Sequence, residues 1–282
     1  MSERTRDLSG SKPRALVLRA PGTNCDTEMC RAFELAGASV DLVHLDAACA
    51  KPDRIDAFDL VGFPGGFSYG DDVASGRIYA MRVREHLYLA LARALNRGVP
   101  MIGACNGFQV MVQIGLLPGP DADQPWPSNV PPSQSVALTD NRDSRFHDEW
   151  VRVAIAADSP CIWTSGLLAE YPDELAELAL RMPIAHGEGR FVASSPTIAN
   201  DLIAQGRAPV RYIDDPNGSE SAIAGICDAT GRVFGLMPHP ERFLDWTRHP
   251  YWTRLPKALL KKPAPGHVIF RSAVEAAKLV GR

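Results

Sequence analysis

Residues Met101–Met111 read MIGACNGFQVM, and this stretch decides the fold that the rest of the chain is expected to build. The apolar run Val99–Gly103 predicts a buried central strand, and Phe108–Ile114 predicts the helix after it. Cys105 falls at the junction of the two. A buried strand that leads at once into a helix is typical of a parallel α/β sheet, because parallel strands need crossover connections.

The preceding residues repeat this alternation of strand and helix. Arg14–Ala20, Ser39–Leu45 and Asp59–Phe63 are short runs rich in β-forming residues, and Asp26–Ala36 has a helical pattern. Strand, helix and strand at this spacing again predict a parallel sheet.

Residues that commonly begin and end helices support these boundaries. We expect Asp26 to cap the N-terminus of the first helix and Gly37 to adopt the left-handed conformation after its end. Met81–Arg97 has the apolar period of an amphipathic helix and is followed by Gly98. Further strands are predicted at Ser135–Leu138, Trp150–Ile155, Ala222–Cys227 and Val233–Met237, and a last helix at His267–Val280.

The chain is expected to hold one main domain. Residues 1–13 are predicted to form a disordered or extended tail, residues 14–245 the domain, and residues 246–282 a C-terminal extension whose helix packs on it. Residues 119–134 are rich in proline and small polar residues, which predicts a long surface excursion rather than a linker.

Composition excludes several classes of protein. The 282 residues carry a formal net charge of -3, which gives no electrostatic attraction to nucleic acid or to anionic membranes. No window approaches the roughly 18 consecutive apolar residues of a membrane span, and the polar start lacks the core of a signal peptide, so a cytoplasmic protein is expected. The six cysteines form no CxxC pair, which argues against a disulfide framework and a structural zinc site.

Cys105 has the surroundings of a nucleophile. Gly103-Ala104-Cys105-Asn106-Gly107 fits GxCxG, the cysteine form of the nucleophile elbow, in which a sharp turn lifts the reactive side chain above the sheet. Glycines suit this turn because the closely packed backbone leaves little room for a Cβ. The N–H groups at the start of the following helix favour the reactive thiolate. The alternative is that Cys105 is a small apolar residue in a tight turn.

A base for this thiol is predicted at His239. Among the seven histidines, only His239 ends a plausible buried strand and has a carboxylate, Glu241, at a useful offset. Pro238 and Pro240 are expected to hold the segment extended, so that residues i and i+2 point the same way. Cysteine, histidine and carboxylate then form an acyl-transfer triad. The alternatives are a turn histidine and a surface ion pair between Glu241 and Arg242.

The oxyanion that such a reaction develops needs backbone donors. Val61–Phe63 ends a predicted strand, and a glycine pair follows it in Pro64-Gly65-Gly66-Phe67. We expect the N–H groups of Gly66 and Asn106 to form the oxyanion hole. A flexible turn is the alternative, whereas a phosphate loop is disfavoured because no Gly-Lys-Ser or Gly-Lys-Thr follows.

Five segments together resemble a known family. PGGFSYGDD, GACNGFQ, PIAHGEGRF, PNGSESAIAGI and GLMPHPER resemble class I glutamine amidotransferases, and among them the glutaminase subunits of phosphoribosylformylglycinamidine synthase, from about Arg14 to Arg242. GxCxG is shared across the class, and HGEG followed by PNGS is specific to these subunits. The resemblance implies a flavodoxin-like three-layer sandwich, with a mostly parallel central sheet between helices, and the triad Cys105, His239 and Glu241.

The resemblance also implies a glutamine pocket. Phe67, Gln109 and the segment from His186 and Gly187 to Gly189 would line it, although a polar His-Gly turn is an alternative for His186. Family members carry an Asn-Cys-Asp element after the first strand, present here as residues 24–26, for which a turn with a helix cap is the alternative. The chain has Asp215 where the family pattern has asparagine before PNGS.

The function implied by the resemblance is glutamine hydrolysis through a cysteine thioester. The ammonia would pass to a synthetase subunit that converts formylglycinamide ribonucleotide to its amidine in de novo purine biosynthesis. That subunit would supply ATP and Mg²⁺, a small bridging subunit is a further candidate partner, and no cofactor or metal is expected in this chain. The alternatives are another cysteine hydrolase on a similar fold, of the peptidase or deglycase type, and a non-catalytic regulatory subunit.

Overall fold

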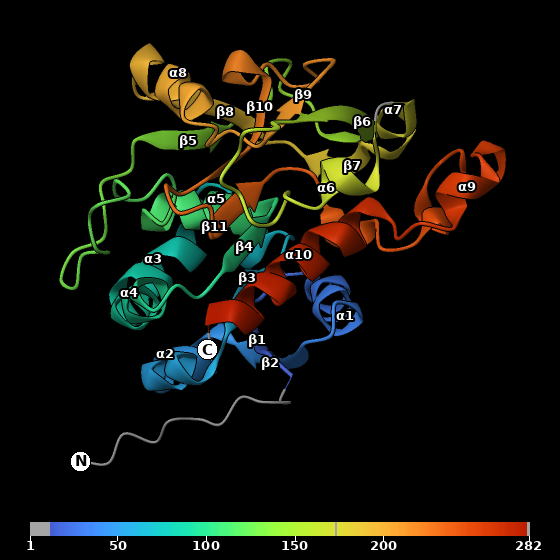
Figure 1. The fold of residues 1–282 in the computed structure, drawn as a ribbon. Coiled ribbons are helices and arrows are strands. Elements are labelled where there is room, and N and C mark those ends of the chain that lie inside the picture. The colour runs from blue at the N-terminus through green and yellow to red at the C-terminus, as the bar shows by residue number, and fades with distance from the viewer. Residues whose placement is uncertain (1–11, 173, 281–282) are drawn as a thin grey trace.

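The strand that ends beside Cys105, β4 (Met101–Ala104), lies near the middle of the main sheet (Figure 1). The computed structural model describes residues 12–172 and 174–280. Within these residues the main sheet has nine strands, in the order β2-β1-β3-β4-β11-β10-β9-β6-β7. The other strands of this sheet are β1 (Arg14–Arg19), β2 (Ser39–His44), β3 (Leu60–Phe63), β6 (His147–Ile155), β7 (Arg181–His186), β9 (Val210–Tyr212), β10 (Ile223–Cys227) and β11 (Val233–Leu236).

The sheet has a parallel half and an antiparallel half. From β2 to β11 all neighbours pair in parallel, whereas the pairs from β11 to β7 are all antiparallel. Only β10 and β6 are reversed, so seven of these nine described strands point the same way. A separate antiparallel pair, β5 (Val136–Thr139) and β8 (Arg190–Ala193), lies beside the sheet.

Helices cover both faces of the sheet, which gives three layers. In β1 the side chains of Leu16 and Leu18 join one apolar cluster, and those of Ala15 and Val17 join the other, as the alternation of a doubly covered strand requires. The first cluster contains residues of α2 (Leu45–Ala50), α3 (Arg77–His86), α4 (Tyr88–Asn96), α5 (Asn106–Ile114) and α8 (Pro196–Ala204). The second contains residues of α1 (Asp26–Leu35), α6 (Leu167–Glu170), α7 (Glu174–Ala179), α9 (Lys257–Leu260) and α10 (Pro265–Val280). The predicted α/β sandwich with a mostly parallel sheet is confirmed.

The helix predicted over Met81–Arg97 is two helices. The chain breaks between α3 and α4 at Leu87, whose φ of -117° lies outside the helical range. Leu87 is nevertheless fully buried, so the apolar period continues across the break. Periodicity reports which side chains face the core, and it does not detect a kink.

Asp26 does not cap α1, contrary to the expectation. Cys25 is the N-cap residue and provides no side-chain cap, while Asp26 is the first helical residue and pairs with Arg19 at 3.2 Å. Its carboxylate still stabilises the positive end of the helix. Gly37 has a φ of +96°, as expected for the residue after a helix.

The excursion over residues 119–134 contains no helix or strand, and it is fastened to α4. Trp126 is buried, and its backbone N–H and C=O bond the side chain of Asn96 at 2.9 and 3.1 Å. Tyr88 donates from its hydroxyl to the carbonyl of Pro127 at 2.9 Å. The excursion is therefore an ordered cover over one edge of α4.

The C-terminal helix α10 is part of the core. Phe270 meets Phe33 of α1 edge to face, with ring centroids 4.9 Å apart. Gly266 donates its N–H to the carbonyl of Phe243 at 3.1 Å, and a Cβ at Gly266 would overlap the carbonyl of Pro240. The division at residue 245 stays a prediction, and residues 1–11 of the predicted tail lie outside the described residues. No helix in the described ranges is long and apolar enough to cross a membrane.

Candidate active site

Cys105 occupies a strained turn between β4 and α5. Its φ of 50° and ψ of -109° lie outside the ordinary regions for a residue with a side chain, at a cost of about 1–3 kcal/mol. Its N–H donates to the carbonyl of Leu236 in β11 at 2.8 Å, which fixes the end of the strand. A Cβ at Gly107 would overlap the carbonyl of Phe63, and one at Gly103 would collide with the sulfur of Met111. The two flanking glycines are thus required by the backbones and side chains around the turn.

His239 and Glu241 form a buried pair. Nδ1 of His239 lies 2.6 Å from Oε1 of Glu241, and the two side chains are 1% and 0% exposed. The expectation of an extended segment is wrong, because Pro240, Glu241 and Arg242 form a 3₁₀ turn. Proline suits the first position of such a turn, where its fixed φ fits and no N–H is needed. The turn brings the carboxylate back beneath the imidazole.

The charge state of His239 follows from its neighbours. Burial by itself lowers the pKa of His239, but the charge of Glu241 and the nearby Cys105 outweigh burial and hold this pKa well above its usual range. Nε2 of His239 is buried and accepts or donates no hydrogen bond within the described residues. The ring therefore has one nitrogen committed to Glu241 and one nitrogen free.

Cys105 and His239 face one cavity of about 190 Å³. The Cys105 sulfur lies 3.6 Å from the carbonyl oxygen of Ala185, at the end of β7. The residues that line this cavity are Asn24, Gly66, Phe67, Cys105, Phe146, Asp148, Ala185, His239 and Arg242. Strand ends from both halves of the sheet therefore meet around the sulfur.

Asn106 and Gly66, the two residues expected to supply the oxyanion hole, lie near Cys105 in different segments of the chain. Asn106 is the first residue of α5, so its backbone N–H has no partner within the helix. Gly66 lines the cavity with a φ of +144°, and a Cβ there would collide with the backbone of Gly22 and Asn24. Only glycine fits at that position, and the role of these two N–H groups stays a prediction.

Of the residues expected to line a glutamine pocket, Phe67 lies in the cavity wall and is 46% exposed. Gln109 is buried and lies outside this lining: its side chain accepts from Asn106 at 3.0 Å and donates to the backbone of Glu188. His186 and Gly187 also lie outside the lining. Their roles in binding stay predictions.

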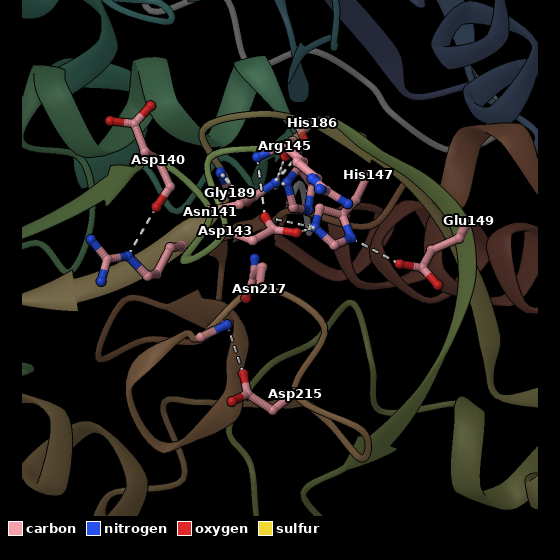
Figure 2. A network of polar contacts seen from close by, with 12 residues as sticks. Asp140, Asn141, Asp143, Arg145, His147, Glu149, His186, Gly189, Asp215 and Asn217 are labelled. Atoms are coloured by element: carbon pink, nitrogen blue, oxygen red, sulfur yellow. Dashed lines mark hydrogen bonds and ion pairs between the residues drawn. The ribbon is translucent and has the colours of Figure 1, made fainter.

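His186 is the buried last residue of β7 rather than part of an exposed turn. Its Nδ1 lies 3.1 Å from Oδ1 of Asn141 (Figure 2). Burial, with smaller contributions from the charges of His239 and His147, lowers the pKa of His186 from 6.5 to about 3. His186 is therefore a neutral ring at neutral pH.

Asn141 is a site residue that the sequence did not reveal. Its Nδ2 donates to the carbonyls of Arg145 and His186, both at 2.8 Å, and its Oδ1 accepts from the N–H of Gly189 at 3.2 Å (Figure 2). Asn141 thereby holds the loop before β6 against the HGEG segment. It lies in the polar stretch TDNRDS, where no local pattern marks it as buried.

The PNGS loop joins the same network. The N–H of Arg142 donates to the carbonyl of Asn217 at 3.0 Å. Asp215, which is labelled in Figure 2, accepts from the N–H of Gly218 at 2.9 Å. Asp215 closes this turn with the acceptor oxygen that asparagine would also offer. The HGEG and PNGS segments are thus both fastened to the loop before β6.

The Asn-Cys-Asp element also belongs to the site. Cys25 is buried, and its sulfur lies 3.9 Å from Nδ1 of His239, donates to Oδ1 of Asn24 at 3.1 Å and accepts from Nη2 of Arg242 at 2.9 Å. The donor atoms of Cys25, His239 and Glu241 lie within 4.8 Å of one another. His239 and Glu241 already bond each other, and Cys25 bonds Arg242, so these donors are committed. That the chain binds no metal stays a prediction.

Comparisons with known proteins agree with this geometry. Residues 12–275 match the model of the CobB/CobQ-like glutamine amidotransferase domain. The phosphoribosylformylglycinamidine synthase subunit PurQ of Dehalococcoides mccartyi is 40% identical over 277 residues, which cover 96% of this chain and 100% of the relative. The subunit PurQ of Cereibacter sphaeroides is 41% identical over 234 residues, which cover 82% of this chain and 90% of the relative.

A solved structure also resembles this chain over nearly its whole length. A chain in the structure of PurLQS from Thermotoga maritima superposes with a TM-score of 0.68 at 31% identity, over 94% of this chain and 99% of that one. The matched lengths are nearly complete on both sides, so the likeness extends over the whole described fold. The chain therefore belongs to the CobB/CobQ-like glutamine amidotransferase family and, within it, to the PurQ subunits of phosphoribosylformylglycinamidine synthase.

Proposed function

We propose that this chain is the glutaminase subunit of phosphoribosylformylglycinamidine synthase, and that it hydrolyses L-glutamine at Cys105. The observation that carries the proposal is the arrangement of Cys105 and His239 on one cavity, with His239 bonded to the buried Glu241 at 2.6 Å. Membership of a glutamine amidotransferase family supports glutamine as the substrate.

The reaction proceeds in two halves. Because the pKa of His239 is raised, its Nε2 already carries the proton of Cys105, and the resulting thiolate attacks the side-chain amide carbon of glutamine. The tetrahedral intermediate collapses as His239 gives that proton to the departing nitrogen, so that ammonia leaves and a γ-glutamyl thioester stays on Cys105. Water, deprotonated by His239, then attacks the thioester, and glutamate leaves as the thiol is restored.

The surrounding groups stabilise charge during these steps. Glu241 fixes the orientation of the imidazole and stabilises its protonated form. The N–H groups of Gly66 and Asn106 donate to the oxyanion, as backbone donors do in acyl transfer. The thiol, imidazole and carboxylate are sufficient for this chemistry, so the half-reaction in this chain uses no cofactor of its own.

The ammonia is consumed by a partner. At neutral pH free ammonia is mostly protonated, and the ammonium ion has no lone pair for attack, so a shielded transfer preserves its reactivity. The names of the relatives, which are synthase subunits, support a synthetase as the partner subunit. That subunit binds ATP, Mg²⁺ and formylglycinamide ribonucleotide and forms the amidine of purine biosynthesis, and a small bridging subunit completes the complex. The cytoplasmic location stays a prediction.

The test is glutamate release by the purified chain with and without the synthetase subunit. Cys105→Ala should lower the rate by at least about 10⁴-fold, as removal of a covalent nucleophile does. Cys49→Ala, a half-buried cysteine on α2, is the matched control and should keep the wild-type rate. Wild-type activity in Cys105→Ala, or labelling of another cysteine by a diazo ketone analogue of glutamine, would contradict the proposal.

A further inference from the structure

Two loops beside the start of α5 are joined by two carboxyl groups and one hydroxyl group. Asp71 is the last residue of the short 3₁₀ turn η2 (Ser68–Asp71), and Glu188 belongs to the HGEG segment. Ser75, two residues before α3, contacts both of them. Asp71 and Glu188 are half-buried and Ser75 is buried. The proposed reaction steps use none of these three side chains.

The hydroxyl of Ser75 lies within hydrogen-bond distance of both carboxyl groups. Its Oγ is 2.8 Å from Oε1 of Glu188 and 3.1 Å from Oδ2 of Asp71. A hydroxyl has one hydrogen to donate, and an ionised carboxylate only accepts, so this hydroxyl cannot form a full hydrogen bond to two ionised carboxylates. Both contacts are satisfied when one of the two carboxyl groups carries a proton and donates it to Oγ.

The remaining contacts assign this proton to Oδ2 of Asp71. Glu188 accepts at both oxygens, since its Oε2 also accepts from the N–H of Ser75 at 3.3 Å, and this is the pattern of an ionised carboxylate. Asp71 accepts at Oδ1, from the N–H of Gly76 at 3.2 Å and from Nδ2 of Asn106 at 3.4 Å, and its Oδ2 contacts the hydroxyl alone. Burial raises the pKa of Asp71, and the charge of Glu188 adds a smaller effect in the same direction.

These groups hold the first turn of α5 from two sides. Asn106 is 2% exposed, and its side-chain amide is bonded to η2 at both ends: Oδ1 accepts from the N–H of Ser68 at 3.4 Å, and Nδ2 donates to Asp71. From the other side, Gln109 donates from its side chain to the carbonyl of Glu188. The two loops therefore fix one helical turn, and the first N–H group of that turn is a proposed oxyanion donor.

The backbone of η2 is strained where these contacts hold it. Tyr69, Gly70 and Asp71 follow one another with φ of 55°, 71° and 53°, in the left-handed region that residues with a side chain rarely adopt. Such a conformation persists only where surrounding contacts impose it. Without the contacts of Asp71 the loop should relax, and Gly66, the other proposed oxyanion donor, should then shift relative to Asn106.

We propose that Asp71 and Glu188 share one proton through Ser75, and that this latch of three residues positions the two N–H groups of the proposed oxyanion hole. The neutral Asp71 donates to Ser75, and Ser75 donates to the ionised Glu188. The inference rests on the proposed hydrolysis of glutamine. The three residues are positioning residues, because they act through the backbone that they hold. Their effect falls on kcat rather than KM, since the oxyanion develops only after the substrate is bound.

The first experiment tests the latch, by glutamate release from the chain in complex with the synthetase subunit. Ser75→Ala removes the shared hydroxyl, and Asp71→Ala removes the contacts to Ser75 and Asn106. Each should lower kcat by about 10- to 100-fold, less than the loss of a whole oxyanion donor, and should change KM by no more than about two-fold. An unchanged kcat in both variants, or losses that appear in KM alone, would overturn the positioning role.

The second experiment locates the proton with two isosteric changes. Asp71→Asn keeps an acceptor at Oδ1 and a donor toward Ser75, so kcat should return to within about two-fold of wild type. Glu188→Gln leaves one acceptor where two are needed, so kcat should fall by about 10-fold or more. Asp72→Asn and Glu34→Gln change exposed carboxylates and should keep the wild-type rate. A loss in Asp71→Asn as large as that in Glu188→Gln would overturn the assignment of the proton.

A stability measurement separates this inference from the proposed function. The folded pKa of Asp71 is raised above its unfolded value of about 3.9, so its contribution to stability is lost as pH rises from that value through the folded pKa. Among the contacts given above for Asp71 and Ser75, the other group that titrates there is the carboxyl of Glu188. In urea denaturation, Asp71→Asn should gain stability relative to wild type between about pH 4 and pH 7.

The two proposals can then fail separately. A difference in stability between Asp71→Asn and wild type that does not change with pH would overturn the shared proton, whatever the activity. A wild-type chain that shows the expected change but releases no glutamate in the complex would overturn the proposed function and keep the shared proton.

Discussion

In the half of the sheet formed by β2, β1, β3, β4 and β11 the strands run parallel and are largely covered by helices, whereas β10, β9, β6 and β7 pair antiparallel. Cys105 and His239 follow the ends of β4 and β11 in the first half. Asp148, Ala185 and the loop held by Asn141 come from the second. The two residues proposed to react thus follow regular strands, and the cavity wall depends on loops that are held by side-chain hydrogen bonds.

The difference explains what a sequence can reveal. Around Cys105 the constraint is backbone packing. Glycines in the sequence indicate the positions where a Cβ does not fit. Around Asn141 the constraint is a set of hydrogen bonds from one amide to its own loop, at Arg145, and to the distant segment from His186 to Gly189. Such contacts appear only when the chain is folded, since asparagine is equally common in exposed turns.

The sharpest test of this comparison replaces one glycine in each half by alanine. At Gly107 the new methyl group would overlap the carbonyl of Phe63, whereas at Gly187 its nearest neighbour is Phe146 at 3.8 Å, an ordinary contact. Gly107→Ala should therefore cost about 3 kcal/mol of unfolding free energy or more, and Gly187→Ala should stay within about 0.5 kcal/mol of wild type. Urea denaturation measures both, and similar losses would break the comparison.

Much of the parallel half could be predicted from the sequence, because backbone packing and burial leave local patterns in the sequence. The strands of this half follow from their apolar runs, and the proposed triad follows from GxCxG and the His-Pro-Glu spacing. In the antiparallel half, β7 was missed because Arg181 and Pro183 interrupt its apolar pattern, and β9 is only three residues long with Arg211 exposed at its centre. The pairing of His239 with Glu241 was predicted correctly from a wrong backbone conformation, since the 3₁₀ turn and an extended chain both bring these side chains together.

The second prediction concerns the hydrogen bonds of the antiparallel half. Asn141→Ala removes four side-chain contacts and leaves the buried carbonyl of His186 without this partner, so the unfolding free energy should fall by about 2 to 3 kcal/mol. The KM for glutamine should rise, because the wall beside Cys105 loosens. Asn129→Ala, an exposed asparagine bonded only to its neighbour's N–H, is the control and should change neither quantity. A neutral Asn141→Ala variant would show that the wall does not depend on this network.

The third prediction uses two histidines, one from each half, with opposite responses to pH. The pKa of His239 is raised in the folded chain, so its stabilising pairing with Glu241 is complete below the unfolded pKa of about 6.5 and is lost as pH rises through the folded pKa. Glu241→Gln should therefore destabilise the chain more at pH 6 than at pH 9. Denaturation at the two pH values measures the loss of unfolding free energy. An equal loss at both would mean that protonation of His239 does not strengthen its pairing with Glu241.

The contribution of His186 to stability should change with pH in the opposite direction. Its folded pKa is lowered to about 3, so the unfolded chain takes up a proton below about pH 6.5 while the folded chain does not. Falling pH therefore lowers stability through this residue, by about 2 kcal/mol between neutral pH and pH 5. His186→Gln should flatten that part of the pH profile, whatever its cost at pH 7. If the dependence of stability on pH were unchanged in His186→Gln, the loss of stability at low pH would come from another residue.

The smallest expected effect on stability lies at the mouth of the cavity. Phe67 and Phe146 face each other there with ring centroids 6.1 Å apart, and the second ring is 53% exposed. Phe146→Ala should cost no more than about 1 kcal/mol, because little apolar area leaves the interior and one aromatic contact is lost. The same change should raise the KM for glutamine several-fold, since Phe146 lines the cavity. Functional loops can carry binding while contributing little to stability. A large loss of stability with an unchanged KM would place Phe146 with the structural residues of the parallel half instead.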